Sequence, residues 1–293
     1  MATRPDIAGQ HTGRSAPPWP GLETEWQSVL LTSKCVDPRT ARVGVGTGES
    51  ILFVHGSFGF GEEQWEHQRP LSLRWRMLLV DRCGHGRSPD TGRSGWNEQS
   101  EDIANLLGGG AHLVGQSHGG TLALLAAFRR PEAVRSLTLV EPNTLGLARD
   151  DVDAEALIDR VSRVLANAND SDPAGAYAAF IGAFGFASPP ATPTAMDLKC
   201  IRASLREPPP WDATIPALHR QAFPVLIVLG GWPSEDPPVR STGRAFRAVG
   251  ERLAKRLGGE LATLPESFHN PQLLGAPFNE RLATFLYSVD TLS

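Results

Sequence analysis

The chain has 293 residues, of which 41% are hydrophobic and 20% are charged, and its formal net charge is −4. This length allows a full core in one domain, or in one domain with an insertion. The modest charge and the absence of a basic run with interleaved aromatic residues argue against a nucleic-acid partner, and no apolar run approaches the roughly 20 residues that cross a bilayer.

The first residues do not predict a packed element. Residues 1–25 are rich in Pro, Gly and Arg and lack the apolar stretch of a secretory signal, so we expect a disordered leader. Cys35, Cys83 and Cys200 are few and widely spaced, which favours reduced thiols and a cytoplasmic location over a disulfide framework. The sequence holds no CxxC or HExxH pattern, so we expect no metal site.

Short apolar runs alternate with helical stretches along the rest of the chain. Residues 28–33 and 41–45 predict an opening hairpin. Further strands are predicted at 51–54, 77–80, 112–114, 137–140, 225–229 and 261–264, and helices at 96–107, 118–129, 246–257 and 278–287. Continuous apolar strands that alternate with helices indicate an α/β fold, with a mostly parallel central sheet and helices on both faces.

The alternation is interrupted between Pro142 and Ala222. Residues 176–186 in this stretch are apolar and aromatic, and an earlier group of apolar residues has helical spacing. That group is Leu157, Ile158, Val161, Val164 and Leu165. We therefore predict an α/β core formed by residues 26–141 and 223–293, with residues 142–222 inserted as a helical cap, or lid, above the strand ends.

One pentapeptide, Gly115-Gln116-Ser117-His118-Gly119, has the pattern G-x-S-x-G between an apolar strand and a helix of small residues. A nucleophilic serine on such a strained turn needs very small neighbours two positions before and after it. The helix that begins at His118 also directs free backbone N–H groups at the site, which favours a developing negative charge. The pattern predicts Ser117 as a nucleophile; the alternative is a plain glycine-rich turn.

A second glycine-rich turn, His55-Gly56-Ser57-Phe58-Gly59, follows the strand at 51–54. Acyl transfer builds an oxyanion that needs preorganised backbone N–H donors. We predict that the N–H groups of Ser57 and His118 form this oxyanion hole. The alternative is an ordinary tight turn.

The order of the motifs resembles the α/β-hydrolase superfamily over nearly the whole chain from Val29. The motifs are His55-Gly56, then Asp81-Arg82-Cys83-Gly84-His85-Gly86-Arg87-Ser88, then Gly115 to Gly119, then a late His269. The resemblance implies the α/β-hydrolase fold, and it gives Asp81 and His85 a structural turn rather than a catalytic role. It also implies that His269, in the loop before the last helix, is the general base, a role that suits an imidazole.

Three residues are candidates for the acid of a catalytic triad. Members of the superfamily usually take it from the loop after the strand at 225–229, but here Trp232 and Pro233 stand at that position. Glu235 and Asp236 lie further along this loop. Glu141 ends the strand at 137–140, a position that some members use, and it keeps the order Ser–acid–His. We predict Glu141, with Asp236 and Glu235 as open alternatives.

These residues predict a serine hydrolase that cleaves a small-molecule carboxylic ester or lactone through an acyl-enzyme, without cofactor or metal. A serine nucleophile argues against dehalogenase and epoxide hydrolase chemistry. Aromatic residues of the predicted cap favour an apolar or aromatic substrate, or else they only pack the cap; they are Phe180, Phe184, Phe186 and Trp211. The open alternatives are a C–C bond hydrolase, thioesterase or peptidase with the same triad, and a hydrolase-fold binding protein with little turnover.

Overall fold

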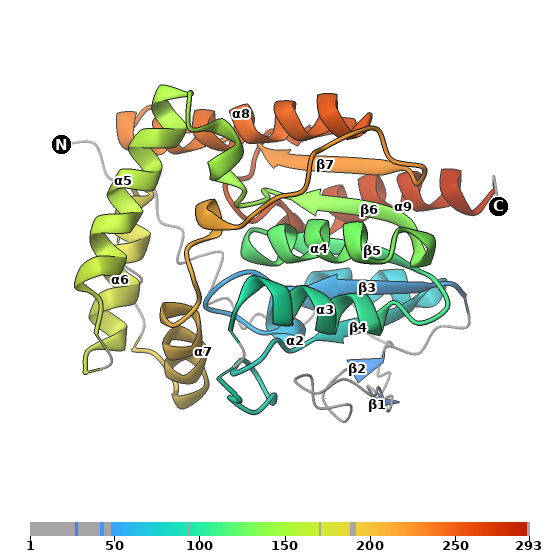
Figure 1. Ribbon diagram of the computed structural model, residues 1–293, viewed down its shortest axis with the longest axis horizontal. Helices are drawn as coiled ribbons and strands as arrows, with labels where there is room; N and C mark the ends of the chain where they lie inside the picture. The colour runs from blue at the N-terminus through green and yellow to red at the C-terminus, as the bar shows by residue number, and fades with distance from the viewer. Residues whose placement is uncertain are drawn as a thin grey trace.

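The structure is a computed structural model, and it describes residues 27–28, 42–43, 48–92, 94–169, 171–187 and 192–291. In these ranges eight strands form one sheet in the order β1-β2-β4-β3-β5-β6-β7-β8 (Figure 1). The strands are β1 (Gln27–Ser28), β2 (Arg42–Val43), β3 (Ser50–Val54), β4 (Arg76–Val80), β5 (Ala111–Gln116), β6 (Val134–Val140), β7 (Val225–Gly230) and β8 (Glu260–Leu264). Neighbours among β3 to β8 pair in parallel, whereas β2 pairs antiparallel with both β1 and β4. The predicted, mostly parallel sheet is confirmed.

The predicted leader, residues 1–25, lies outside the described residues, as does most of the predicted hairpin. The described parts of that hairpin, β1 and β2, pair antiparallel with Gln27 opposite Val43. Cys35 also lies outside the described ranges, whereas Cys83 and Cys200 are buried free thiols.

Helices cover both faces of the sheet (Figure 1). They are α2 (Gly61–Gln64), α3 (Trp96–Leu106), α4 (His118–Arg129), α5 (Val152–Asn167), α6 (Pro173–Ala183), α7 (Ala195–Leu205), α8 (Pro237–Leu257) and α9 (Ala276–Asp290), with short 3₁₀ turns between them. Successive side chains of a strand point to opposite faces. Leu52 and Val54 of β3 pack into one buried core with α3, α4 and α8, while Ile51 and Phe53 pack into another with α9. This alternation explains why residues 51–54 of β3 are apolar on both faces.

Helices α8 and α7 illustrate how the structure differs from the prediction. Helix α8 begins at Pro237, before the predicted start at 246, because a proline fits the first helical turn, where its missing N–H is not needed. Helix α7 had no prediction of its own. Its start is marked by a capping box, in which Thr194 and Asp197 bond each other's backbone N–H groups.

Helices α5, α6 and α7 follow β6 in the chain before β7 begins. They lie on the side to which the arrows of β6 and β7 point (Figure 1). Asp153 in α5 ties this segment to α8, because its carboxylate accepts hydrogen bonds from Arg244 at 2.6 and 2.9 Å. The division of the chain into a core and a cap stays a prediction. None of the helices in the described ranges has the length and apolar character needed to span a membrane.

Candidate active site

Strained backbone marks one edge of the sheet. Among the described residues, the non-glycine residues with positive φ are Phe58, Ser117, Glu141 and Trp232, at 69°, 52°, 44° and 54°. They follow β3, β5, β6 and β7, respectively, so all four lie beyond the carboxyl ends of parallel strands. Such conformations cost of order 1–3 kcal/mol each and cluster at functional sites. In open α/β sheets this edge is also where ligands bind.

Ser117 occupies the sharp turn between β5 and α4. Its backbone is fixed on both sides: its N–H donates to the carbonyl of Val140 at 2.9 Å, and its carbonyl accepts from the N–H groups of Gly120 and Asn143 at 2.9 and 3.1 Å. The side chain is 7% exposed. These hydrogen bonds therefore fix the backbone that carries the Ser117 hydroxyl.

The glycines of this turn are required by space. A Cβ on Gly119 would overlap the carbonyl oxygens of His55 and Val54, and one on Gly115 would overlap the carbonyl of Gly119. Backbone atoms cannot swing aside as a flexible side chain can. The G-x-S-x-G pattern thus reflects the close packing of α4 against the end of β3.

We expect Gly119→Ala to lower the free energy of unfolding by about 1–3 kcal/mol, the usual cost of overpacking a filled site. The matched control is Gly182→Ala in α6, where a Cβ would have nothing within 4 Å. That change is expected to be neutral or to stabilise by about 0.5–1 kcal/mol, because alanine favours the helix. Urea unfolding measures both, and equal effects would contradict the packing argument.

His269 reaches Ser117 from the loop between β8 and α9. Its Nε2 lies 2.8 Å from Ser117 Oγ. The backbone carbonyl of His269 accepts a hydrogen bond from the Gln116 side chain at 3.0 Å, and its ring lies 4.5 Å from the ring of Phe246. These contacts fix both ends of the histidine next to the serine.

Glu141 completes the group on the other side of the imidazole. It directly follows β6 and is fully buried, and its Oε2 lies 3.4 Å from His269 Nδ1. Its Oε1 accepts hydrogen bonds from the Gly230 N–H at 2.6 Å and from Trp232 Nε1 at 3.2 Å. Trp232, the residue at the usual position of the acid, here helps to hold the Glu141 carboxylate.

The two alternative acids, Glu235 and Asp236, lie near the end of the loop that joins β7 to α8. The side chain of Glu235 is fully exposed and pairs with Arg240 at 3.5 Å. Asp236 is the residue before the first turn of α8. The structure thus brings together Ser117, His269 and Glu141 of the predicted residues.

The predicted oxyanion turn lies against Ser117. A Cβ built on Gly56 would be 3.1 Å from Ser117 Cβ, which places the Gly56–Ser57 peptide beside the serine. No hydrogen bond between residues in the described ranges uses the backbone N–H of Ser57 or of His118. His118 is buried and Ser57 is half-buried, so both N–H groups are suited to an acceptor supplied by a ligand.

Three buried histidines near this turn stay neutral. Burial, reinforced by the charge of Arg82, holds the pKa of His55, His85 and His118 well below the usual histidine value. The ring of His118 stacks on Trp96 with centroids 4.4 Å apart. His85 Nε2 lies 2.9 Å from Ser204 Oγ, and Asp81 accepts the N–H groups of Gly61 and Arg87 at 2.8 and 2.9 Å. Asp81 thus links the start of α2 to the turn at Arg87, and His85 links that turn to α7.

Aromatic residues of the segment between β6 and β7 approach the site at different points. Phe184 lies 5.4 Å from the His269 ring, and Phe180 lies 4.6 Å from Phe58 in the oxyanion turn. Phe186 stacks on Trp232 at 5.8 Å. Trp211 is buried in the larger hydrophobic core. Of the four aromatics singled out in the sequence, Phe180 and Phe184 therefore border the reacting groups most directly.

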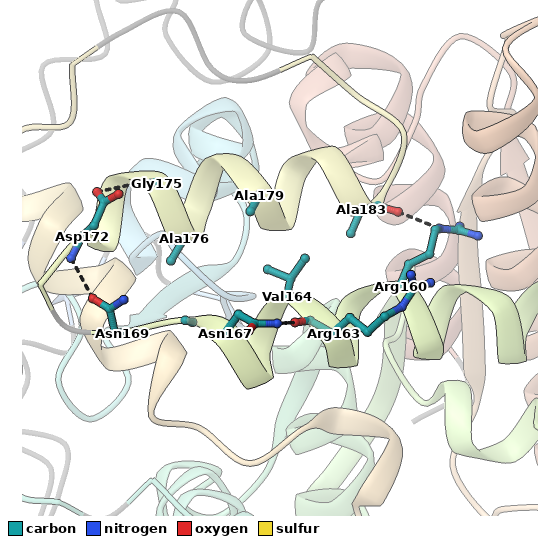
Figure 2. Close-up of a pocket in the computed structure, with 11 residues that line it drawn as sticks. Arg160, Arg163, Val164, Asn167, Asn169, Asp172, Gly175, Ala176, Ala179 and Ala183 are labelled. Carbon is teal, nitrogen blue, oxygen red and sulfur yellow. Dashed lines mark hydrogen bonds between the residues drawn. The ribbon is translucent and has the colours of Figure 1, made fainter.

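A cavity of about 560 Å³ lies between α5 and α6, and none of Ser117, Glu141 and His269 lines it. Figure 2 shows Val164 of α5 and Ala179 of α6 facing each other across it. At one end Arg160 donates to the Ala183 carbonyl at 2.9 Å and to the Thr242 hydroxyl at 3.1 Å. This cavity is separate from the reacting atoms.

The sequence prediction missed one group of residues beside the site. Arg82 and Ser204 bond the oxyanion turn, and Glu207, 125 positions after Arg82 in the chain, pairs with Arg82. The signal in the sequence is the position of Arg82 two residues after a buried strand, within the D-x-x-G-x-G-x-S stretch.

Comparison with known sequences agrees with this geometry. A family model described as the alpha/beta hydrolase family matches residues 51–281. The pimeloyl-[acyl-carrier protein] methyl ester esterase of Aeromonas hydrophila is 34% identical over 109 residues, which are 36% of this chain and 42% of that protein. The sn-1-specific diacylglycerol lipase ABHD11 of Danio rerio is 29% identical over 145 residues, 47% of this chain and 41% of that protein. The chain thus spans less than half the length of these relatives.

Solved structures resemble the chain over more of its length. The carboxylesterase CesB (YbfK) from Bacillus subtilis superposes with a TM-score of 0.58 at 18% identity, over 90% of this chain and 92% of that one. Est816, described as an N-acyl homoserine lactone degrading enzyme, superposes with a TM-score of 0.53 at 24% identity, over 86% of this chain and 99% of that one. At such identities the likeness establishes the fold alone.

Proposed function

Because the chain belongs to the alpha/beta hydrolase family, we propose that it is a serine hydrolase of carboxylic esters. One observation carries the proposal: Ser117 Oγ lies 2.8 Å from His269 Nε2, and Glu141 Oε2 lies 3.4 Å from His269 Nδ1. Nucleophile, base and orienting carboxylate in this order form the arrangement that activates a serine hydroxyl.

In the proposed acylation, Ser117 Oγ attacks the ester carbonyl carbon while its proton passes to His269 Nε2. The carbonyl π electrons move to oxygen, and the N–H groups of Ser57 and His118 bind the resulting oxyanion. Collapse of this intermediate breaks the bond to the alkoxy group, which takes the proton from His269 and leaves as the alcohol. The Glu141 carboxylate stabilises the imidazolium that exists between these two transfers.

Deacylation repeats the sequence with water. His269 removes a proton from a water molecule as its oxygen attacks the acyl carbon, and the same N–H groups bind the oxyanion. The bond to Ser117 Oγ then breaks, the carboxylic acid leaves, and the serine regains its proton from His269. Each step uses only side-chain and backbone groups of this chain.

The proposal extends to an ester or lactone with an apolar or aromatic part. Phe184 beside His269 and Phe180 beside Phe58 support this preference, because they give the surroundings of the reacting groups an apolar surface. The names of two similar proteins, a methyl ester esterase and a diacylglycerol lipase, support an ester as the bond that is cleaved.

A panel of substrates tests the class of reaction. The panel holds p-nitrophenyl esters of increasing chain length, aromatic lactones, an aryl thioester, a vinylogous diketone and a peptide anilide, each at equal concentration. We expect turnover of the esters, and of lactones if the ring fits. Exclusive turnover of the diketone, thioester or anilide would replace the ester proposal, and a folded protein that turns over none would favour a binding role.

A further inference from the structure

The carbonyl of the Gly56–Ser57 peptide is held by two side chains, His55, whose Nδ1 lies 2.8 Å from it, and Arg82. In a trans peptide the C=O of one residue and the N–H of the next point in opposite directions, so a contact that fixes the Gly56 carbonyl also fixes the direction of the Ser57 N–H. The Gly56 carbonyl accepts a hydrogen bond from Arg82 Nη2 at 2.8 Å. Arg82 Nε also donates to the carbonyl of His55 at 3.1 Å. One guanidinium thus holds two consecutive carbonyls of the turn.

Arg82 is itself fixed by a carboxylate from the segment between β6 and β7. Its Nη1 bonds Glu207 Oε1, and it also donates to Gln99 Oε1 at 2.9 Å. The side chains of Arg82 and Glu207 are 2% and 3% exposed. A buried guanidinium is stable only when it is paired and hydrogen-bonded, so the place of Arg82 under the turn depends on Glu207.

The other flank of Ser57 is held from the same segment. The backbone N–H of Phe58 donates to Ser204 Oγ at 2.8 Å, and Ser204 lies in the last turn of α7. Gly56 is therefore linked to Glu207 through Arg82, and Phe58 is bonded directly to Ser204. Both contacts come from the end of α7 and the turn after it. The positive φ of Phe58 is a conformation that these contacts maintain.

We propose that Arg82, Glu207 and Ser204 are positioning residues, which aim the Ser57 N–H at the developing oxyanion and so couple the segment between β6 and β7 to the rate of the chemical step. This inference rests on the proposed function, since only a reaction that builds an oxyanion uses that N–H. An N–H that is misaimed weakens binding of the transition state while binding of the substrate changes little. The effect therefore falls on kcat rather than on KM.

Two variants test the inference without leaving a buried charge. The double variant Arg82→Met/Glu207→Gln removes both charges of the pair, and Ser204→Ala removes the acceptor of the Phe58 N–H together with the hydroxyl that contacts His85 Nε2. The matched control is Arg244→Met/Asp153→Asn. It neutralises another ion pair between the segment that joins β6 to β7 and the rest of the chain. Both residues are distant in sequence from the oxyanion turn. Thermal unfolding and circular dichroism establish that each variant is folded.

With a p-nitrophenyl ester, we expect kcat to fall about 10–100-fold in the double variant and about 10-fold in Ser204→Ala, with KM within about two-fold. An aryl trifluoromethyl ketone, whose adduct with Ser117 is a tetrahedral oxyanion, is expected to lose affinity by the same factor as kcat. The control double variant is expected to keep the wild-type kcat and inhibitor affinity. A purely structural role would change the melting temperature without this shared loss.

The positioning role is wrong, while the proposed function stands, if Ser204→Ala keeps kcat and ketone affinity within about three-fold of wild type. The same must hold for Arg82→Met/Glu207→Gln where that double variant folds. If the wild-type protein turns over no ester and binds no ketone, the proposed function fails and this inference falls with it. The Ser204→Ala result decides the matter even where the double variant does not fold, because that change removes a single oxygen.

Discussion

Ser117→Ala is expected to lower kcat/KM for ester hydrolysis by about 10⁴–10⁶-fold. The variant lacks the oxygen that forms the acyl bond, and the remaining rate comes from the oxyanion donors and from substrate binding alone. Ser117 Oγ contacts the His269 side chain at 2.8 Å, whereas the turn is held by backbone hydrogen bonds, so loss of the oxygen leaves the backbone turn intact. Initial rates with a p-nitrophenyl ester, together with a melting curve, measure both effects.

The fold supplies a control for this variant at the opposite edge of the sheet. Ser136 Oγ lies 2.8 Å from His112 Nδ1, and His112 Nε2 lies 3.0 Å from Asp290 Oδ1. This chain of groups matches the chemistry of the candidate triad, but it is buried near the amino ends of β5 and β6. Burial also holds the pKa of His112 below its usual value.

Ser136→Ala is therefore expected to keep the wild-type kcat, at some cost in stability from the lost hydrogen bond. Comparable loss of activity in the Ser117 and Ser136 variants would mean that general destabilisation explains both. Loss only in the Ser136 variant would mean that the nucleophile has been assigned to the wrong edge of the sheet.

Glu141→Gln is expected to lower kcat by about 10³–10⁴-fold, while the protein stays folded. The amide keeps the size of the carboxylate and can still accept from Gly230 and Trp232. Its NH₂ group then faces His269 Nδ1 in place of an acceptor oxygen, so the imidazole loses both the tautomer and the charge partner that catalysis requires.

The controls for Glu141 are the two acids that the sequence left open. Asp236→Asn and Glu235→Gln are expected to change kcat less than about two-fold, because Glu235 faces solvent and Asp236 begins α8. The opposite pattern, with activity kept in Glu141→Gln and lost in Asp236→Asn, would assign the acid to the loop after β7.

The local chemistry of the chain predicts the sheet well and singles out Ser117, for identifiable reasons. The strand at 51–54 is a continuous apolar run because both of its faces are buried, and such a run needs no knowledge of distant residues. Ser117 is predictable because the small residues that its turn requires are its own neighbours in sequence. The start of α8 is less predictable, since its first turn begins with two prolines, which also occur in loops.

The acid and the support of the oxyanion turn depend on contacts that no local pattern contains. Glu141 can be preferred over Asp236 only once the path of the loop after β7 is known. That path turns at Trp232, whose backbone N–H donates to the Ser267 carbonyl at 2.9 Å. Likewise, the partner of Arg82 is 125 positions away. Long-range pairs of this kind follow from the fold and not from spacing.

The most direct test of the account is to identify the residue that carries the acyl group. The wild-type protein is mixed with a p-nitrophenyl ester, quenched in acid during the first turnover, and digested for mass spectrometry. We predict one acyl group per chain, on the peptide that contains Ser117, and none on the Ser117→Ala protein. Turnover with an acyl group on another peptide, or with no covalent adduct in a quench fast enough to resolve one turnover, would contradict the assignment of Ser117 as the nucleophile.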